Sequence, residues 1–195
     1  SLSNAVVQSS VNAFGADAMA GFGAYMKIDG FNILPVLSLS LAMTTYTGQN
    51  LGAGKVDRVK KGMWLTLAMG LGYTAATGAL LLVFSAPLMR LFTENADAVA
   101  YGQLAMRYFC PFYFILGIMH ILAGTVRGAG KSIPPMVIML VSLCIVRIVW
   151  LKLIAPLYGT IDGVFIAYPI TWAVGMALMV LYAVFGKWLK VSDEY

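Results

Sequence analysis

The chain has 195 residues, of which 61% are hydrophobic and only 11% are charged, against about 25% charged residues in an ordinary soluble domain. With a mean hydropathy of +0.84, it has too few charges to cover a globular surface in water. The net charge of +5 comes from Lys and Arg scattered through apolar sequence, which makes no dense basic face and excludes a nucleic-acid-binding module. One His and two Cys, both inside apolar runs, predict neither a metal site nor a disulfide.

Apolar segments long enough to cross a bilayer set the fold class. A bilayer core of about 30 Å needs about 20 mostly apolar helical residues. We therefore expect an all-α integral membrane protein with five complete transmembrane helices and, before them, the C-terminal part of a sixth. In chain order the expected segments are residues 2–14, 17–47, 62–89, 99–126, 134–156 and 163–186.

The first two segments are unusual in length. Segment 17–47 would be about 46 Å long as a straight helix, so we expect it to tilt or to project from the membrane, with a kink at Pro35. The opening residues SLSNAVVQSSVNAFG lack the basic region of a signal peptide and look like the second half of a helix. We expect the chain to begin within a larger protein.

The loop charges predict the orientation, because Lys and Arg accumulate in cytoplasmic loops. Arg90 alone lies in the loops of one side, where acidic residues also occur. We expect the side with more Lys and Arg to be cytoplasmic. The protein would then be a multi-pass protein of the plasma (inner) membrane with its C-terminus in the cytoplasm. The eight basic residues of that side are Lys55, Arg58, Lys60, Lys61, Arg127, Lys131, Lys187 and Lys190.

The stretch GTVRGAGKS, residues 124–132, is partly similar to a phosphate-binding loop. That loop needs four residues between its first Gly and Gly-Lys-Ser, whereas five separate Gly124 from Gly130, and residues 108–126 contain no Asp, Glu, Lys or Arg. The stretch therefore predicts a tight turn between two spans, with Pro134 starting the next helix. A similar string, TGQNLGAGK at residues 47–55, occupies the preceding turn on the same side.

Together these two turns resemble those of the multidrug and toxic compound extrusion (MATE) family, and the resemblance covers essentially the whole chain. The residues that carry it are Gly48-Gln49-Asn50-Leu51-Gly52-Ala53-Gly54-Lys55, then Arg58, and Arg127-Gly128-Ala129-Gly130 leading to Pro134.

The resemblance implies that residues 1–195 are one lobe of a two-lobe, twelve-helix transporter. The order of elements is similar to the C-terminal lobe, entered partway through the seventh helix. It implies export of cationic or amphipathic drugs and toxic compounds, in exchange for protons or sodium, by alternating access. The expected partners are the N-terminal lobe, membrane lipid and small organic cations, with no cofactor.

One departure from the family concerns ion coupling. Some branches carry a carboxylate in the helix before the Arg-Gly turn, but residues 108–126 contain none. In other branches the coupling acid lies in the first lobe. We therefore expect the proton or sodium site to lie outside this chain.

Charged residues within the apolar segments are candidates for substrate or cavity contacts. Lys27 and Asp29 lie in the second segment, about 200° apart on a helix, so they cannot pair well directly. A charge at this depth needs a partner or water. For Asp29 we favour a structural ion pair with another helix, for instance with Arg147 of the fifth segment, over a cavity-facing role. Arg107 and Lys152, nearer the helix ends, are expected to snorkel to the headgroups.

Polar side chains on the apolar segments are weaker candidates. Gln8, Asn12, Asn32 and Tyr113 could contact substrate, although joining helices by hydrogen bonds is the more common role. His120 could shuttle protons, but a neutral His packed between helices is favoured.

Two other functions deserve comparison. A lipid-linked saccharide flippase of the same broad superfamily would offer a cationic cavity, to which Lys27, Arg107 and Arg147 could contribute. A membrane enzyme would need several acids, or His with acids, at one surface, whereas the eight acids are mostly solitary. We therefore predict a transporter and not an enzyme.

Overall fold

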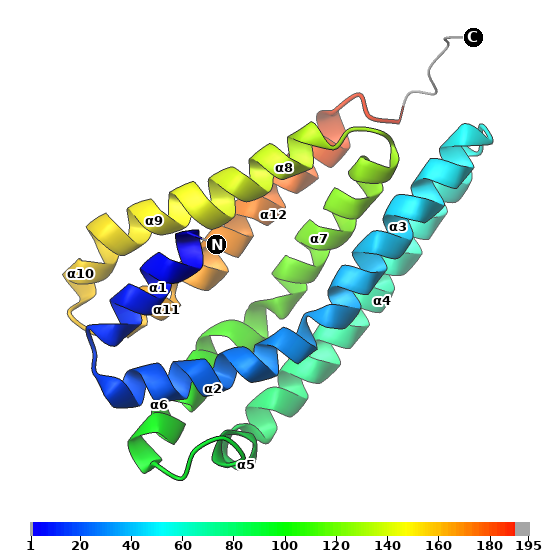
Figure 1. Cartoon of the computed structure of the whole chain (residues 1–195). Helices are drawn as coiled ribbons and strands as arrows, with labels where there is room; N and C mark the ends of the chain where they lie inside the picture. The colour runs from blue at the N-terminus through cyan, green and yellow to red at the C-terminus, as the bar shows by residue number, and fades with distance from the viewer. Residues whose placement is uncertain (1, 190–195) are drawn as a thin grey trace.

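The computed structural model describes residues 2–189, and all regular secondary structure in this range is helical (Figure 1). The α-helices are α1 (Leu2–Asn12), α2 (Ala16–Asn32), α3 (Leu34–Gly52), α4 (Val56–Val83), α5 (Ser85–Arg90), α6 (Ala96–Phe109), α7 (Tyr113–Gly128), α8 (Ile133–Leu140), α9 (Arg147–Val149), α10 (Ala155–Tyr158), α11 (Asp162–Phe165) and α12 (Ala167–Phe185).

Joined end to end, these helices form five stretches long and apolar enough to cross a membrane, as the sequence predicts. The shorter α1 precedes them. The five spans are Ala16–Gly52, Val56–Val83, Ala96–Gly128, Ile133–Tyr158 and Asp162–Phe185. The chain is therefore a multi-pass membrane protein.

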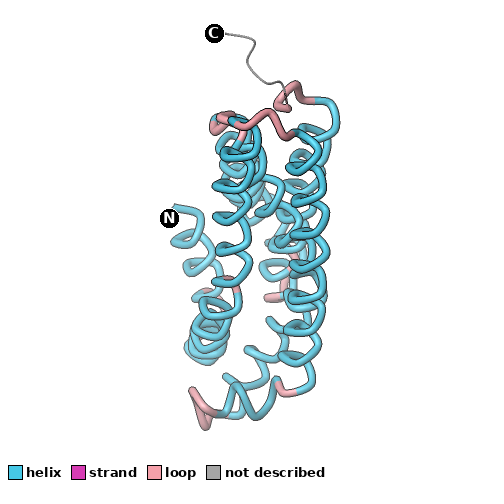
Figure 2. The backbone as a smooth tube through the Cα atoms, turned by 90° about the vertical axis from the view of Figure 1, so that its right-hand side faces the viewer, coloured by secondary structure: helices cyan, strands magenta, loops and turns pink. Residues whose placement is uncertain are grey.

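Helix α7 lies at the centre of the bundle and packs against α3, α4 and α12, while α2 packs against α6. The most apolar part of the span Ala96–Gly128 is 72% buried, against 17% for Ala16–Gly52 and Ile133–Tyr158. The outer spans therefore present their apolar surface outward. Figure 2 shows the helices running side by side, with most loops at the two ends of the bundle.

Prolines divide several spans. The kink expected at Pro35 is confirmed, because α2 ends at Asn32 and α3 begins at Leu34, with Pro35 in its first turn. The span Ala96–Gly128 is interrupted by the 3₁₀ turn η1 (Cys110–Phe112), which contains Pro111. Proline lacks a backbone donor and its ring collides with the carbonyl four residues earlier.

Two expected segments differ from the observed ones. The second span is Val56–Val83, where the expected segment was 62–89, since its helix begins within the charged stretch and breaks at Phe84. Pro87 explains the break, because its ring would meet the carbonyl of Val83. The fourth span, Ile133–Tyr158, contains two unpredicted π-helical turns, η2 (Val141–Val146) and η3 (Trp150–Ile154). The second lies just before Pro156, which a widened turn accommodates.

The two GAGK strings form the same kind of turn. Gly54 and Gly130 both have positive φ, 69° and 78°. In each turn the Lys N–H donates to the carbonyl five residues earlier, Lys55 to Asn50 (2.8 Å) and Lys131 to Val126 (3.3 Å). This is a Schellman motif that ends a helix, so the turn predicted for residues 124–132 is confirmed.

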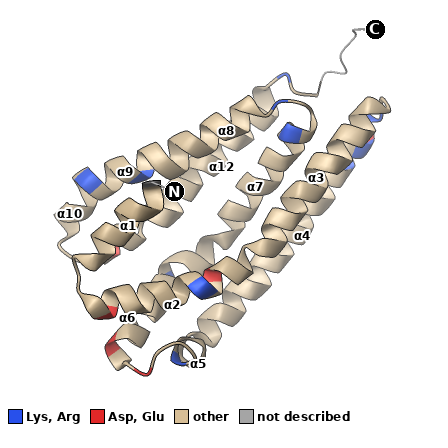
Figure 3. Ribbon diagram, viewed as in Figure 1, with Lys and Arg blue, Asp and Glu red and all other residues tan. Residues whose placement is uncertain are grey.

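Charges separate between the ends of the bundle (Figure 3). Lys and Arg gather where α3 meets α4 and where α7 meets α8. At the opposite end Asp17 accepts a hydrogen bond from Nδ2 of Asn95 (2.7 Å), and Oδ1 of the same asparagine caps α6 by accepting from the N–H groups of Asp97 and Ala98. Lys190, one of the eight basic residues, lies outside the described range. The assignment of the basic end to the cytoplasm stays a prediction.

Candidate functional site

Asp29 lies in a cluster of oxygen atoms between α2 and α7. Its Oδ1 accepts hydrogen bonds from the hydroxyls of Tyr25 (3.0 Å) and Tyr113 (2.8 Å), and these two hydroxyls lie 2.7 Å apart. Both tyrosines are at most 2% exposed. Tyr25 lies one helical turn before Asp29 on the same face of α2, and Tyr113 is the first residue of α7.

This triangle of three oxygens has three short contacts but only two hydroxyl protons. A tyrosine hydroxyl donates one hydrogen bond, and an ionised carboxylate donates none. If Asp29 is ionised, both hydroxyl protons point to its Oδ1 and the contact between Tyr25 and Tyr113 has no proton. A third proton, on the carboxyl group, gives every contact a donor.

Arg147, on the other side of the bundle, is deeply buried and 6% exposed. Its Nη2 donates to Thr171 Oγ1 (2.9 Å), and its guanidinium lies 4.3 Å from the centroid of the Tyr168 ring. Its Nε is buried and has no hydrogen-bond partner among the described residues. The guanidinium thus contacts a hydroxyl and a ring, but its charge is not matched by a carboxylate there.

The ion pair expected between Asp29 and Arg147 is not formed in the described part of the chain. Aromatic rings lie between them: Tyr25 is 5.0 Å from Phe109, and Phe109 is 4.6 Å from Tyr168, measured between ring centroids. The expectation was wrong because neutral tyrosine hydroxyls satisfy the acid, while a π face receives the base. Sequence periodicity does not distinguish a tyrosine that donates to a carboxylate from one that packs.

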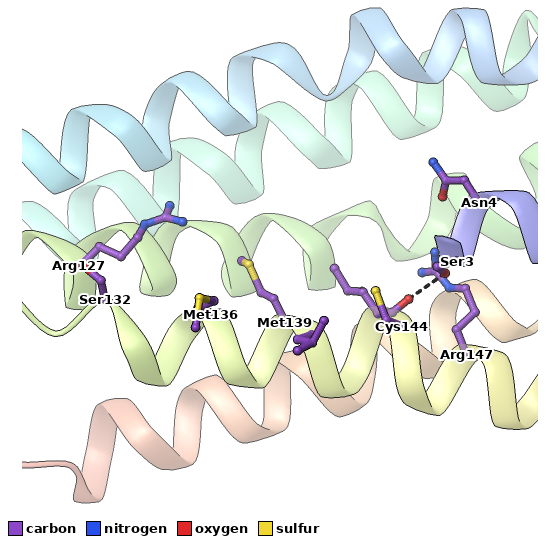
Figure 4. A pocket seen from close by; sticks show the side chains of 10 residues that line it. Ser3, Asn4, Arg127, Ser132, Met136, Met139, Cys144 and Arg147 are labelled. Atoms are coloured by element: carbon purple, nitrogen blue, oxygen red, sulfur yellow. Dashed lines mark hydrogen bonds between the residues drawn. The ribbon is translucent and has the colours of Figure 1, made fainter. Parts of the chain in front are cut away.

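A cavity of about 580 Å³ lies beside Arg147, between α1, the end of α7, and α8 to α9 (Figure 4). Its wall is mostly apolar, with one arginine from α7 and one from α9. Figure 4 shows Arg147 pointing from α9 toward Ser3 of α1, whose Oγ donates to the carbonyl of Leu143 (2.9 Å). The lining residues are Ser3, Asn4, Arg127, Ser132, Met136, Met139, Leu140, Leu143, Cys144 and Arg147.

The other charged candidates lie apart from both sites. Lys27 is exposed, and its Nζ lies 5.6 Å from the centroid of the Phe92 ring. Arg107 and Lys152 are exposed, which agrees with the expected snorkelling. The three cations Lys27, Arg107 and Arg147 therefore do not line one cavity.

The polar candidates are spread over several contacts. Asn32 accepts a hydrogen bond from Tyr73 through its backbone oxygen (2.9 Å), and His120 accepts one from Ser40 in the same way (2.6 Å). Gln8 is exposed and lines a cavity of about 190 Å³ with Phe22 and Tyr168, among others. Asn12 is exposed near the end of α1. Their roles in binding stay predictions.

The sequence analysis missed the residues that contact Asp29 and Arg147, apart from Tyr113: Tyr25, Tyr168 and Thr171. A spacing of four residues between Tyr25 and Asp29 is the one signal that could have joined a pair in advance. The others come from distant helices, and only the tertiary structure brings them together.

Comparisons with known proteins agree with this fold. A family model, MatE, matches residues 1–151. The chain is 28% identical to the probable multidrug resistance protein YpnP of Bacillus subtilis, over 96% of this chain and 42% of that protein. It is 30% identical to an FAD transporter of Shewanella oneidensis, over 87% of this chain and 37% of that protein. The chain thus spans less than half the length of these relatives.

Solved structures of transporters share the fold at low sequence identity. The MATE transporter VcmN of Vibrio cholerae, in its bent form, superposes with a TM-score of 0.86 and 22% identity, over 96% of this chain and 42% of that one. A MOP superfamily transporter of Pyrococcus furiosus gives a TM-score of 0.86 at 18% identity, over 95% and 41%. Since the family model matches more than half of the residues, this chain belongs to the MatE family, whose members are membrane transporters and not enzymes.

Proposed function

We propose that this chain is the C-terminal lobe of a proton-driven exporter of cationic or amphipathic compounds in the plasma membrane. It works with an N-terminal lobe by alternating access, and its C-terminus faces the cytoplasm. Support comes from the family match and from relatives named as probable multidrug resistance proteins. The basic end of the bundle supports the orientation.

The observation that carries the proposal is the oxygen triangle of Asp29, Tyr25 and Tyr113. A proton on the carboxyl completes the triangle, and its loss leaves one short contact without a donor. In the described part of the chain, the side-chain hydrogen-bond partners of Asp29 are two tyrosines and include no basic group, so protonation is the local way to neutralise it. Asp29 is therefore the acid that we assign to proton exchange in this lobe.

The triangle also links two breaks in long helices. Asp29 lies four residues before Ile33, where α2 gives way to α3, and its carbonyl accepts the N–H of Ile33 (3.0 Å). Tyr113 directly follows the 3₁₀ turn at Pro111. Binding or loss of a proton at Asp29 changes these contacts and so biases the angle at both breaks. The proton then binds the two conformations of the lobe with different affinity, which coupling requires.

Other titratable groups surround the triangle. Cys110 lies on η1, three residues before Tyr113, and Tyr168 lies on α12 beyond Phe109. Arg147 is next to Tyr168.

The coupling site expected outside this chain is compatible with this assignment, because each of two lobes can hold its own acid.

A surface for the apolar part of a substrate adjoins Asp29 on α2. Phe22, Met26 and Asp29 share one face of this helix, since residues three, four and seven apart lie together. Phe22 and Met26 line the cavity of about 190 Å³ that also includes Gln8. Flexible Met side chains and aromatic rings suit ligands of varied shape.

The test is efflux of ethidium from vesicles that contain the full-length protein, with a proton gradient or a sodium gradient imposed in turn. We expect the proton gradient to drive efflux, and Asp29→Asn to abolish it at normal abundance. Asp57→Asn, the same change at an exposed acid in the first turn of α4, is the matched control. If Asp29→Asn shows the same efflux as the unmutated protein, Asp29 does not take part in coupling. If the sodium gradient alone drives efflux, sodium and not the proton is the coupling ion.

The flippase alternative receives less support from the geometry. Of the three cations that it would need in one cavity, Arg147 lines a large one, Lys27 lies against Phe92 and Arg107 is exposed. Absence of ethidium efflux from a well-expressed protein would move this alternative ahead.

A further inference from the structure

An apolar groove on the outer surface of the bundle ends beside a group of lysines. The groove has a volume of about 320 Å³, lies between the first half of α4, the middle of α7 and the end of α12, and is lined by hydrophobic residues alone. It is far from the start of the chain, because α1 packs on α2, α9, α11 and the two π turns. Figure 1 shows α4 behind α3 and α12 behind α8, with α1 in front.

The groove is about as deep as one leaflet of a bilayer. On α4 it runs from Met63 to Leu71, and Lys60 lies just before it on the same helix. From Lys60 to Leu71 the helix rises by about 16 Å, which is close to half of a hydrocarbon core of about 30 Å. A lipid whose headgroup lies level with Lys60 would therefore have its acyl chain beside the groove over the whole depth of its leaflet.

Two exposed lysines of α4 lie at the shallow end of the groove. Lys60 and Lys61 precede the groove residue Trp64 by four and three residues, so all three share one side of the helix. Trp64 is 67% exposed, and tryptophan favours the level of the lipid headgroups. Asp57, the acid in the first turn of α4, offsets only part of the charge of the two lysines.

A third lysine reaches the same end of the groove from α12. Lys187 is exposed and follows the groove residue Val184 by three positions, just beyond the end of α12. The chain is anchored at this point, because the next residue, Trp188, is buried and its Nε1 donates to the carbonyl of the groove residue Ala183 (2.9 Å). Lysines from both helices that flank the groove are therefore present at the depth of a headgroup.

From this arrangement we infer that the groove binds an anionic phospholipid, with one acyl chain between α4, α7 and α12 and the headgroup phosphate against Lys60, Lys61 and Lys187. Charge complementarity selects this occupant, because lysines next to apolar surface attract anionic lipids and discriminate against zwitterionic ones. The inference does not rest on the proposed function. Failure of proton-driven efflux would leave it standing, and failure of lipid binding would leave the efflux proposal standing.

Trp64 lines the groove and provides a local probe of the lipid bound there. We would place the full-length protein in phosphatidylcholine nanodiscs with increasing fractions of a phospholipid that carries bromine on its acyl chains, which quenches tryptophan fluorescence on contact. The signal lost in Trp64→Phe is that of Trp64. Brominated phosphatidylglycerol is expected to reach half of its maximal quenching at a fraction at least about fivefold lower than brominated phosphatidylcholine. Trp150 of η3, isolated in the same way through Trp150→Phe, should show no such preference.

Charge variants connect the preference to the lysines. Lys60→Gln combined with Lys61→Gln should remove most of the preference for phosphatidylglycerol. Arg58→Gln is the matched control, since Arg58 lies on the same turn but about 120° from Trp64 around the helix, and it should retain the preference. All three positions are exposed, so these variants should fold.

A second pair of variants tests the groove itself. Ala68→Phe places a ring in the groove and should reduce the preference, whereas Met69→Phe, at the next exposed position and outside the groove, should not. Equal half-quenching fractions for the two lipids would overturn the inference, and so would a preference that survives the loss of Lys60 and Lys61. An equal loss in Arg58→Gln would also overturn it, because the basic end would then attract anionic lipid without a defined site.

Discussion

The guanidinium of Arg147 lies 4.3 Å from the centroid of the Tyr168 ring, and Tyr168 in turn contacts Phe109, with 4.6 Å between ring centroids. Phe109 also packs on Tyr25, one of the two tyrosines that donate to Asp29. A buried acid and a buried base thus occupy one lobe without neutralising each other.

Removing the charge of Arg147 should not destabilise the fold. Burying a charge without a carboxylate partner costs hydration free energy, and the contacts made in its place recover little of it. Thr171 keeps its own hydrogen bond to the carbonyl of Tyr168 when the guanidinium is removed. Arg147→Met should therefore have a melting temperature within about 2 °C of the unmutated protein, or above it. Thermal unfolding of the full-length protein in detergent measures this. A fall of more than about 5 °C would show that Arg147 has a structural anion partner.

The hydroxyl of Tyr113 should contribute to both stability and proton exchange. Tyr113→Phe removes two short contacts of the triangle, one with Asp29 and one with Tyr25, and a lost hydrogen bond typically costs about 0.5–1.5 kcal/mol. We expect a lower melting temperature and a changed pH dependence of ethidium efflux. Tyr46→Phe, at a more exposed tyrosine, is the matched control. An unchanged pH profile for Tyr113→Phe would separate the triangle from proton exchange.

Close packing between α3 and α7 depends on Gly124. A Cβ atom there would collide with the backbone carbonyl oxygen of Ser40, which cannot move aside as a flexible side chain could. Gly124→Ala should therefore destabilise the protein by about 1–3 kcal/mol, the usual cost of overpacking. Gly72→Ala, where a Cβ meets nothing within 4 Å, should be neutral or slightly stabilising because Ala favours helix. Equal melting temperatures for the two variants would contradict the packing.

The break between α2 and α3 should respond to Pro35. Pro35→Ala restores a backbone donor and removes the clash with Phe31, so the two helices should become more nearly collinear. Spin labels at Ala20 and Gln49, both exposed, should then move apart in pulsed electron resonance measurements. An unchanged distance would mean that packing of α2 on α6, rather than the proline, sets the angle.

The helices could be predicted from the sequence because length and hydropathy alone limit what crosses a bilayer. Local rules account for the five spans, for the kink at Pro35 and for the two turns at Gly54 and Gly130 that end helices. The limits of segment 62–89 did not, since hydropathy does not register the break that Pro87 imposes at Phe84. The π turn η2 before Arg147 has no local signal either, whereas η3 lies just before Pro156.

The partners of the buried charges were beyond sequence reasoning. Charge complementarity suggested a pair of Asp29 with Arg147, but the structure provides tyrosine hydroxyls for the acid and an aromatic face for the base. Which polar groups meet depends on how α2, α7, α9 and α12 are rotated. That rotation is fixed by packing between helices, and the order of residues along any one helix does not reveal it.

Proton release on substrate binding tests the assignment of Asp29 most directly. Ethidium would be added to the purified full-length transporter in weakly buffered solution, and the released protons would be followed with a pH-sensitive dye. We predict that Asp29→Asn releases about one proton fewer per bound ethidium than the unmutated protein, while Asp57→Asn is unchanged. Equal release by Asp29→Asn and the unmutated protein, at equal ethidium binding, would contradict the account.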